Sequence, residues 1–186
     1  LRLVGVALLG VCFARLALNP GVFHYHARSS TPIFNWYLYT YGIVAACLFA
    51  AVRLLAPPRH RLFDFDIRGV LGALGVVLTF LLLNIEIADY FTAPGATSLV
   101  FEFSGNLARD MTYSIAWSLF ALGLLVVGIA RKLGAARIAG LILMSVTLLK
   151  LFFHDLARLQ EFYRVGAFFV VAVIAIFASF KYQQFK

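Results

Sequence analysis

The chain has 186 residues, of which 63% are hydrophobic, 16% are aromatic and only 13% are charged. A soluble domain of this length buries one apolar core, whereas this chain has six long apolar blocks with nearly all its charges between them or just inside their ends. The composition therefore excludes an ordinary soluble globular protein. The formal net charge of +8 has no soluble domain to carry it, so we expect no nucleic-acid partner.

Each of the six apolar segments is long enough, or nearly so, to cross a hydrocarbon core about 30 Å thick, which requires about 20 helical residues. All five prolines fall between these segments, where water can bond to the backbone. We therefore expect an all-α, polytopic transmembrane helix bundle with about six spans. In chain order the expected spans are 1–18, 33–55, 70–91, 111–130, 138–153 and 165–180.

The connections are too short for a separate soluble domain, so we expect residues 1–186 to form a single transmembrane helical domain. The chain begins at Leu1, inside an apolar segment, rather than at Met, which favours the C-terminal piece of a longer chain. Cys12 and Cys47 lie within apolar spans, where cysteine usually acts as a small hydrophobe. They predict neither a disulfide nor a metal site.

Charged residues divide unequally between the two sides of the expected bundle. The side with both chain ends has ten Lys and Arg against two Asp, whereas the opposite side has six basic and six acidic residues. Because basic residues accumulate in cytoplasmic connections, we expect both ends to be cytoplasmic. The basic residues should also contact anionic membrane lipids.

Ionisable residues at the extracytoplasmic span ends form the candidate site, which we call the ionic cluster. On the third span Glu86 lies about one turn inside the membrane boundary, where lipid exposure is costly, so it should face the bundle with Asp89. Lys150 on the fifth span and Arg164 at the start of the sixth are the expected partners of these carboxylates. The whole expected cluster is Glu86, Asp89, Arg109, Asp110, Lys150, His154, Asp155 and Arg164.

Two interpretations of the ionic cluster remain open. Ion pairs between helices can fix their arrangement, although they add little net stability. Alternatively, the cluster lines a polar extracytoplasmic cleft for an anionic or glycan-bearing ligand, with the carboxylates as acid and base. The first interpretation is favoured, because two acids three residues apart on a helix are common.

Other motifs on this side are weaker. His24 and His26 have a spacing that can chelate a metal, but two imidazoles without a neighbouring Cys or carboxylate are too few, so we expect no metal. The aromatic run 34–41 is typical of an interfacial belt, with a sugar-stacking platform as the alternative. The connection 92–109 is the best candidate for a lid or partner-binding loop.

The C-terminal half contains a distinctive set of residues. It is Arg109-Asp110-x-x-Tyr113-Ser114-x-x-Trp117, Arg137-x-Ala139-Gly140-Leu141, Thr147-x-Leu149-Lys150-Leu151-Phe152-x-x-Asp155-Leu156 and Tyr163-Arg164-x-x-x-Phe168. This set resembles the C-terminal end of a large family of bacterial predicted membrane proteins of unknown function with many transmembrane helices. The resemblance implies a bacterial inner membrane and further spans upstream, and it implies no activity or residue role.

No catalytic triad, phosphate-binding loop or pair of haem-type histidines is present in the sequence, so we expect no cofactor. The sequence therefore favours a non-catalytic scaffold or accessory subunit of a bacterial envelope complex, with protein partners in the membrane. The alternative is an enzyme or carrier that handles a lipid-linked or glycan substrate at the extracytoplasmic face. A solute transporter is third, because the spans are not broken by Gly or Pro in symmetric halves.

Overall fold

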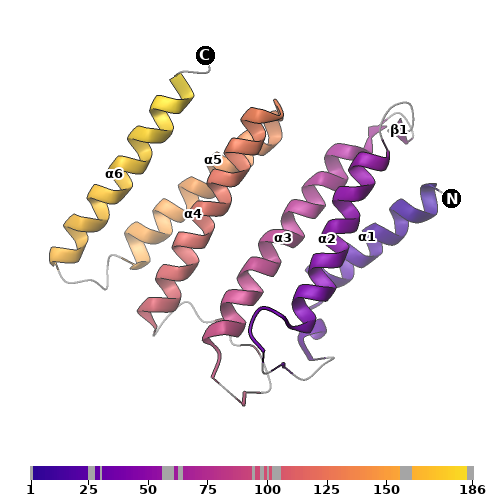
Figure 1. Cartoon of the computed structure of the whole chain (residues 1–186), viewed down its shortest axis with the longest axis horizontal. Coiled ribbons are helices and arrows are strands. Elements are labelled where there is room, and N and C mark those ends of the chain that lie inside the picture. Colours follow the sequence, from indigo (N-terminus) through magenta and orange to yellow (C-terminus); the bar gives the residue numbers. More distant parts are fainter. Residues whose placement is uncertain are drawn as a thin grey trace. The chain divides into compact units, whose positions relative to one another are not determined.

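The computed structural model (Figure 1) describes residues 2–24, 28–29, 31–55, 61–62, 65–93, 95–96, 99, 101, 106–155 and 161–183. Only the backbone is described for residues 24, 61–62, 65, 155, 161–167, 181 and 183. These residues form the helices α1 Arg2–Leu18, α2 Trp36–Leu54, α3 Ile67–Phe91, α4 Leu107–Ala130, α5 Gly134–Lys150 and α6 Glu161–Gln183. The shorter elements are the 3₁₀ helix η1 Pro20–His24, the π-helical turn η2 Leu151–Asp155, and the antiparallel strands β1 Arg61–Leu62 and β2 Phe65–Asp66.

The helical membrane fold that the sequence predicts is confirmed. Among the described residues, α2, α3, α4 and the continuous helix Gly134–His154 are long and apolar enough to cross a membrane. The helix α6 contains a shorter apolar stretch, Phe168–Phe180, and α1 has 17 residues. That α1 and α6 also cross the membrane stays a prediction.

N-caps place several helix starts away from the predicted positions. The side chain of Asn35 accepts a hydrogen bond from Leu38 N, so α2 begins at Trp36 rather than at residue 33. Asp66 caps α3 and Asn106 caps α4 in the same way, and both helices begin three or more residues earlier than predicted. A capping oxygen satisfies a backbone N–H that the helix leaves without a partner, which is why these polar residues decide where each helix begins.

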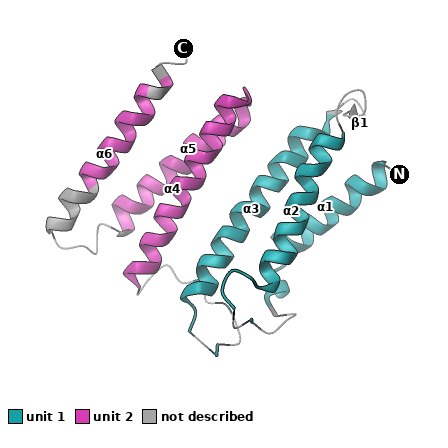
Figure 2. Ribbon diagram, viewed as in Figure 1, with its two compact units in different colours: residues 1–103 teal, residues 104–186 magenta. Residues whose placement is uncertain are grey.

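The chain divides into two compact units, residues 1–103 and residues 104–186 (Figure 2). In the first unit α2 packs along α3, and α1 contacts both. In the second unit α4 packs along α5. The single domain that the sequence predicts over residues 1–186 stays a prediction.

The core of the first unit corrects the interpretation of the aromatic run. Tyr37 and Tyr41 lie one turn apart on the inner face of α2 and are each only 1% exposed, whereas Tyr39 on the opposite face is 59% exposed. The Tyr41 hydroxyl donates a 2.9 Å hydrogen bond to the carbonyl oxygen of Leu16. Two tyrosines therefore hold helices together in the core, and Tyr39 remains a candidate for an interfacial belt.

Candidate functional site

In the first unit, polar residues gather around the C-terminal end of α3. Asp89 in the last turns of α3 and Asn35 at the start of α2 are 1% and 2% exposed. Glu86 lies one turn before Asp89 and is partly buried. The antiparallel arrangement of α2 and α3 brings the start of one helix to the end of the other, and so brings these side chains together.

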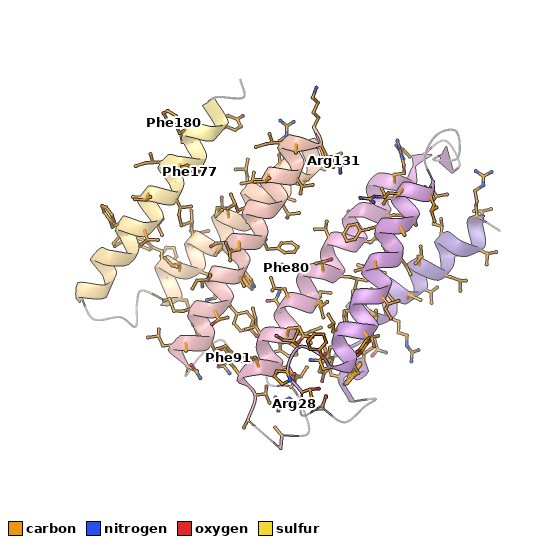
Figure 3. The ribbon with its side chains drawn as sticks, viewed as in Figure 1. Arg28, Phe80, Phe91, Arg131, Phe177 and Phe180 are labelled. Carbon is orange, nitrogen blue, oxygen red and sulfur yellow. The ribbon has the colours of Figure 1, made fainter. Side chains whose placement is uncertain are left out.

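Arg28 connects the segment before α2 to the end of α3 (Figure 3). Its Nε bonds to Oδ1 of Asp89 and its Nη2 bonds to the Asp89 carbonyl oxygen. The guanidinium also donates to the carbonyl oxygens of Thr92 at 3.1 Å and Ala93 at 2.8 Å. Carbonyls at the end of a helix have no partner within it and carry partial negative charge, so Arg28 neutralises both the helix end and the buried carboxylate.

Asn35 joins the two carboxylates to the start of α2. Its Nδ2 donates to Oε2 of Glu86 at 3.0 Å and to Oδ2 of Asp89 at 3.1 Å, while its Oδ1 caps the helix through Leu38 N. One amide thus bonds to both acids and to the backbone. Because an amide combines two donor hydrogens with an acceptor oxygen, no carboxylate or hydroxyl could replace all three bonds.

Glu86 is less completely bonded than Asp89. Ile33, in the segment that leads to Asn35, has a φ of 70°, a strained value for a β-branched residue. The other carboxylate oxygen of Glu86, Oε1, is buried and has no hydrogen-bond partner among the described residues. In the described part of this polar group, the single cation Arg28 therefore accompanies two carboxylates.

In the second unit, the corresponding polar group lies between the start of α4 and the end of α5. The Lys150 ammonium donates to Oγ of Ser114 at 2.8 Å and to the carbonyl oxygen of Asp110 at 3.1 Å. Ser114 and the Asp110 side chain are 1% and 2% exposed. The end of α5 is thus bonded to the first turns of α4 through a charged donor.

The π-helical turn η2 follows directly after Lys150 and contains His154. Its Nε2 lies 3.9 Å from Oδ2 of Asp110, an ion-pair distance if the imidazole is protonated. The neighbouring Arg109 is also buried. Wider helical turns of this kind often occur at functional sites, and here the turn carries His154, whose side chain is 34% exposed next to Asp110.

The structure therefore groups the predicted ionic cluster by unit. It brings Glu86 together with Asp89, and Asp110 with Lys150 and His154. The side chains of Asp155 and Arg164 lie outside the described residues, as do His26 and residues 94, 97–98, 100 and 102–105 of the connection 92–109. The predicted bonds from Glu86 and Asp89 to Lys150 or Arg164 join the two units and stay a prediction.

Sequence reasoning assigned no partner to Arg28 and missed the role of Asn35. Both lie in or next to an irregular connection, 61 and 54 residues before Asp89, so no helical spacing relates them to α3. The one usable signal was Asn35 itself, because an Asn directly before an apolar helical segment is a typical N-cap. Ser114 shared a helical face with Asp110, but its bond to Lys150 was not predicted.

In chemical terms, both groups are bonded mainly within the protein. Their buried acids and amides bond to each other, to cations and to helix ends, and no group of three or more His, Cys, Asp and Glu suited to a metal occurs within the described part of the chain. Glu86 Oε1 is the exception, because an internally bonded network does not explain a buried carboxylate oxygen without a described hydrogen-bond partner.

A family model described as "Predicted membrane protein (DUF2339)" matches residues 1–185. The resemblance that the sequence indicated for its C-terminal half is confirmed, and it extends over almost the whole chain. No curated protein and no solved structure matches the sequence.

Proposed function

The chain belongs to the DUF2339 family of predicted membrane proteins, and from this premise we propose that it is a non-catalytic membrane component. Its role is that of a scaffold or accessory subunit in an envelope complex of a bacterial inner membrane. The distribution of basic residues supports an orientation with both ends of the segment in the cytoplasm.

The observation that carries this proposal is the internal bonding of the two polar groups. The exposed fraction is at most 2% for Asp89, Asn35 and Asp110. The described hydrogen bonds of Arg28 and Lys150 are made to α3 and its C-terminal end and to α4. A substrate-handling site needs charged groups that a ligand can reach. Buried polar networks that bond internally instead fix how helices are arranged, which is the task of a scaffold.

A second observation agrees with the scaffold role. The described side chains of α6 between residues 168 and 182 are almost all exposed, among them Phe177 at 65% and Phe180 at 63% (Figure 3). Such a surface can face lipid, and it is also available to a helix of another chain, where close packing drives association in membranes.

One observation favours the alternative, an enzyme or carrier for a lipid-linked or glycan substrate at the extracytoplasmic face. Glu86 Oε1 is buried without a described hydrogen-bond partner. An underbonded carboxylate inside a membrane protein is a candidate for proton transfer or ligand binding. On this alternative, Glu86→Gln abolishes activity and leaves the amount of folded protein unchanged.

Native mass spectrometry of the full-length protein, released gently from its own membranes, tests the proposal. A scaffold is expected to retain a protein partner in fixed stoichiometry. The paired substitution Phe177→Ala and Phe180→Ala should weaken that partner's retention if α6 is the contact surface, whereas Tyr39→Ala, an exposed aromatic on α2, serves as the control.

The opposite result is equally definite. If the protein is released without a protein partner but with a lipid-linked glycan that Lys150→Ala removes, the scaffold role is wrong and the substrate-handling alternative replaces it. Folding of the Lys150→Ala variant is checked by its thermal unfolding, so that loss of ligand is not confused with loss of structure.

A further inference from the structure

The turn between α4 and α5, together with the first turn of α5, contains three basic residues. The N–H of Leu133 donates to the carbonyl oxygen of Gly128 at 2.8 Å, and the N–H of Lys132 donates to the carbonyl oxygen of Ile129 at 3.1 Å. This pair of bonds is the Schellman arrangement that closes many helix ends. The backbone of the turn therefore sets the positions of Arg131 and Lys132. Figure 3 labels Arg131 at the end of α4.

Lys132 occupies the position in this turn where glycine is usual. Its φ is 55°, in the left-handed region that costs a residue with a Cβ about 1 kcal/mol. A glycine would fit the backbone of the turn better, so the lysine is favourable for its charge rather than its conformation. The C-terminal end of α4 favours a nearby cation, and the same charge is also available to an anion outside the protein.

The third cation, Arg137, is directed back across the start of α5. A Cβ on Gly128 would lie 2.7 Å from Arg137 Cγ, so the stem of the arginine passes directly over that glycine of α4. Its Nη2 lies 3.8 Å from the position of a Cβ on Gly134, the first residue of α5. The absence of a side chain at both glycines thus lets Arg137 lie over the end of α4 and the start of α5, the two helix ends that the turn joins.

Among the described side chains, these three cations have no counter-charge. The side chains of Arg131, Lys132 and Arg137 are exposed, and none makes an ion pair or hydrogen bond within the described part of the chain. The one carboxylate described in this unit, Asp110, lies 21 residues before Arg131 on α4, about 30 Å away along the helix. At that separation, several times the screening length in physiological salt, it cannot neutralise the turn.

The first unit shows the alternative solution at the start of α3. There Asp66 caps the helix and bonds to Arg68 Nη2 at 2.7 Å, so the cation is neutralised by the chain's own acid. The start of α5 has Leu133 in the place of Asp66 and no side-chain cap. The start of α5 therefore lacks a neutralising acid such as Asp66, which the start of α3 contains.

The surroundings of the turn indicate where the missing anion comes from. α4 and α5 are both candidate membrane spans, so the turn between them lies at a membrane surface. Leu133 and Ile138, which flank the cations, are 51% and 60% exposed. Exposed apolar side chains next to unpaired cations match a phospholipid, with its acyl chains beside its charged phosphate.

We propose that Arg131, Lys132 and Arg137 form a binding surface for the phosphate group of an anionic phospholipid. The lipid supplies the negative charge that the turn lacks, while Leu133 and Ile138 contact its acyl region. This surface is separate from both polar groups described above and does not depend on the scaffold role.

The left-handed conformation of Lys132 offers a test in which binding and folding change in opposite directions. Lys132→Gly removes the charge and also the backbone strain, so the purified protein should unfold at an equal or higher temperature. Its retention of phosphatidylglycerol, measured by native mass spectrometry during titration in detergent, should fall about fivefold, the effect of one cation near a lipid surface. Lys132→Arg keeps the charge and should bind as the unmodified protein does.

Three controls distinguish this surface from a general attraction between exposed cations and anions. Arg53→Gln removes one exposed charge from the last turn of α2 and should leave phosphatidylglycerol retention unchanged. Phosphatidylcholine should be retained more weakly than phosphatidylglycerol, and inorganic phosphate should not displace the lipid. The proposal is overturned if Lys132→Gly binds as before, if Arg53→Gln weakens binding equally, or if inorganic phosphate or phosphatidylcholine binds as well as phosphatidylglycerol.

Discussion

Arg28 and Asp89 form an ion pair across 61 residues of chain and connect the segment before α2 to the end of α3. The carboxylate is almost fully buried, and the arginine side chain is 14% exposed. The same guanidinium also bonds to the last carbonyl oxygens of α3. A single side chain from an irregular connection thus completes the end of a membrane-spanning helix.

Arg28→Ala is expected to destabilise the first unit by about 3 kcal/mol, because it leaves the Asp89 carboxylate buried without its cation. The free energy of unfolding in a denaturing-detergent titration measures this effect. Arg68→Ala is the matched control, since it breaks the pair with Asp66. The side chains of Arg68 and Asp66 are 33% and 46% exposed. An exposed, solvent-screened pair contributes far less than a buried one, so this substitution should change the free energy of unfolding little. Equal losses from the two substitutions would contradict the structural role of Arg28.

Asn35 gives a prediction that separates helix capping from its bonds to the acids. Asn35→Ser keeps a capping oxygen and loses the amide donor, so it should cost about 1–3 kcal/mol. Asn35→Asp also keeps the cap but places a third carboxylate beside Glu86 and Asp89, so it should cost more. The same unfolding titration compares the two variants. If Asn35→Asp is the more stable variant, capping outweighs the bonds to the acids.

In the second unit, Ser114→Ala removes an acceptor from the Lys150 ammonium and should cost about 2 kcal/mol, as expected for a hydrogen bond to a charged group. Ser145→Ala is the control, because this serine is exposed on α5 and bonds to the backbone of its own helix at Leu141. Its effect should stay within about 0.5 kcal/mol. Thermal unfolding of both variants in the same detergent measures the difference, and equal shifts would show that the Lys150 bond contributes nothing.

The sequence predicted the helices well and the site only in part, for a physical reason. Apolar length and helical spacing are local properties, so they placed six helices and put Glu86 with Asp89, and Lys150 with His154, near helix ends. The partners of these groups depend on the path of the connections. Arg28 lies in a segment without periodicity, and neither its distance from α3 in the chain nor its charge indicates which carboxylate it meets.

The burial of Tyr37 and Tyr41 escaped prediction for a related reason. Trp and Tyr at a span end are favourable both at the membrane surface and in a helix interface, so residue type alone does not distinguish the two. The spacing of four residues between them was the signal for a shared inner face, and the exposure of Tyr39 between them agrees with it.

Glycine on the α4–α5 interface yields the sharpest test of helix packing. A Cβ at Gly140 would lie 2.9 Å from the Ala121 carbonyl oxygen and 3.1 Å from the Leu125 nitrogen, both backbone atoms that cannot move without the helix. Gly140→Ala should therefore force α5 away from α4 and cost about 1–3 kcal/mol. Gly123→Ala, on α4 with nothing within 4 Å of its Cβ, should instead stabilise the helix by about 0.5–1 kcal/mol.

In thermal unfolding, we expect Gly140→Ala to lower the stability of the protein and Gly123→Ala to raise it, although both substitutions add the same methyl group. If both substitutions stabilise the protein, α4 and α5 do not pack closely at Gly140. The bond between Lys150 and Ser114 would then lose its support as well, because it joins the same two helices. Gly140 thus links the packing of the second unit to its polar group, since the close approach of the backbones brings the Lys150 ammonium within reach of α4.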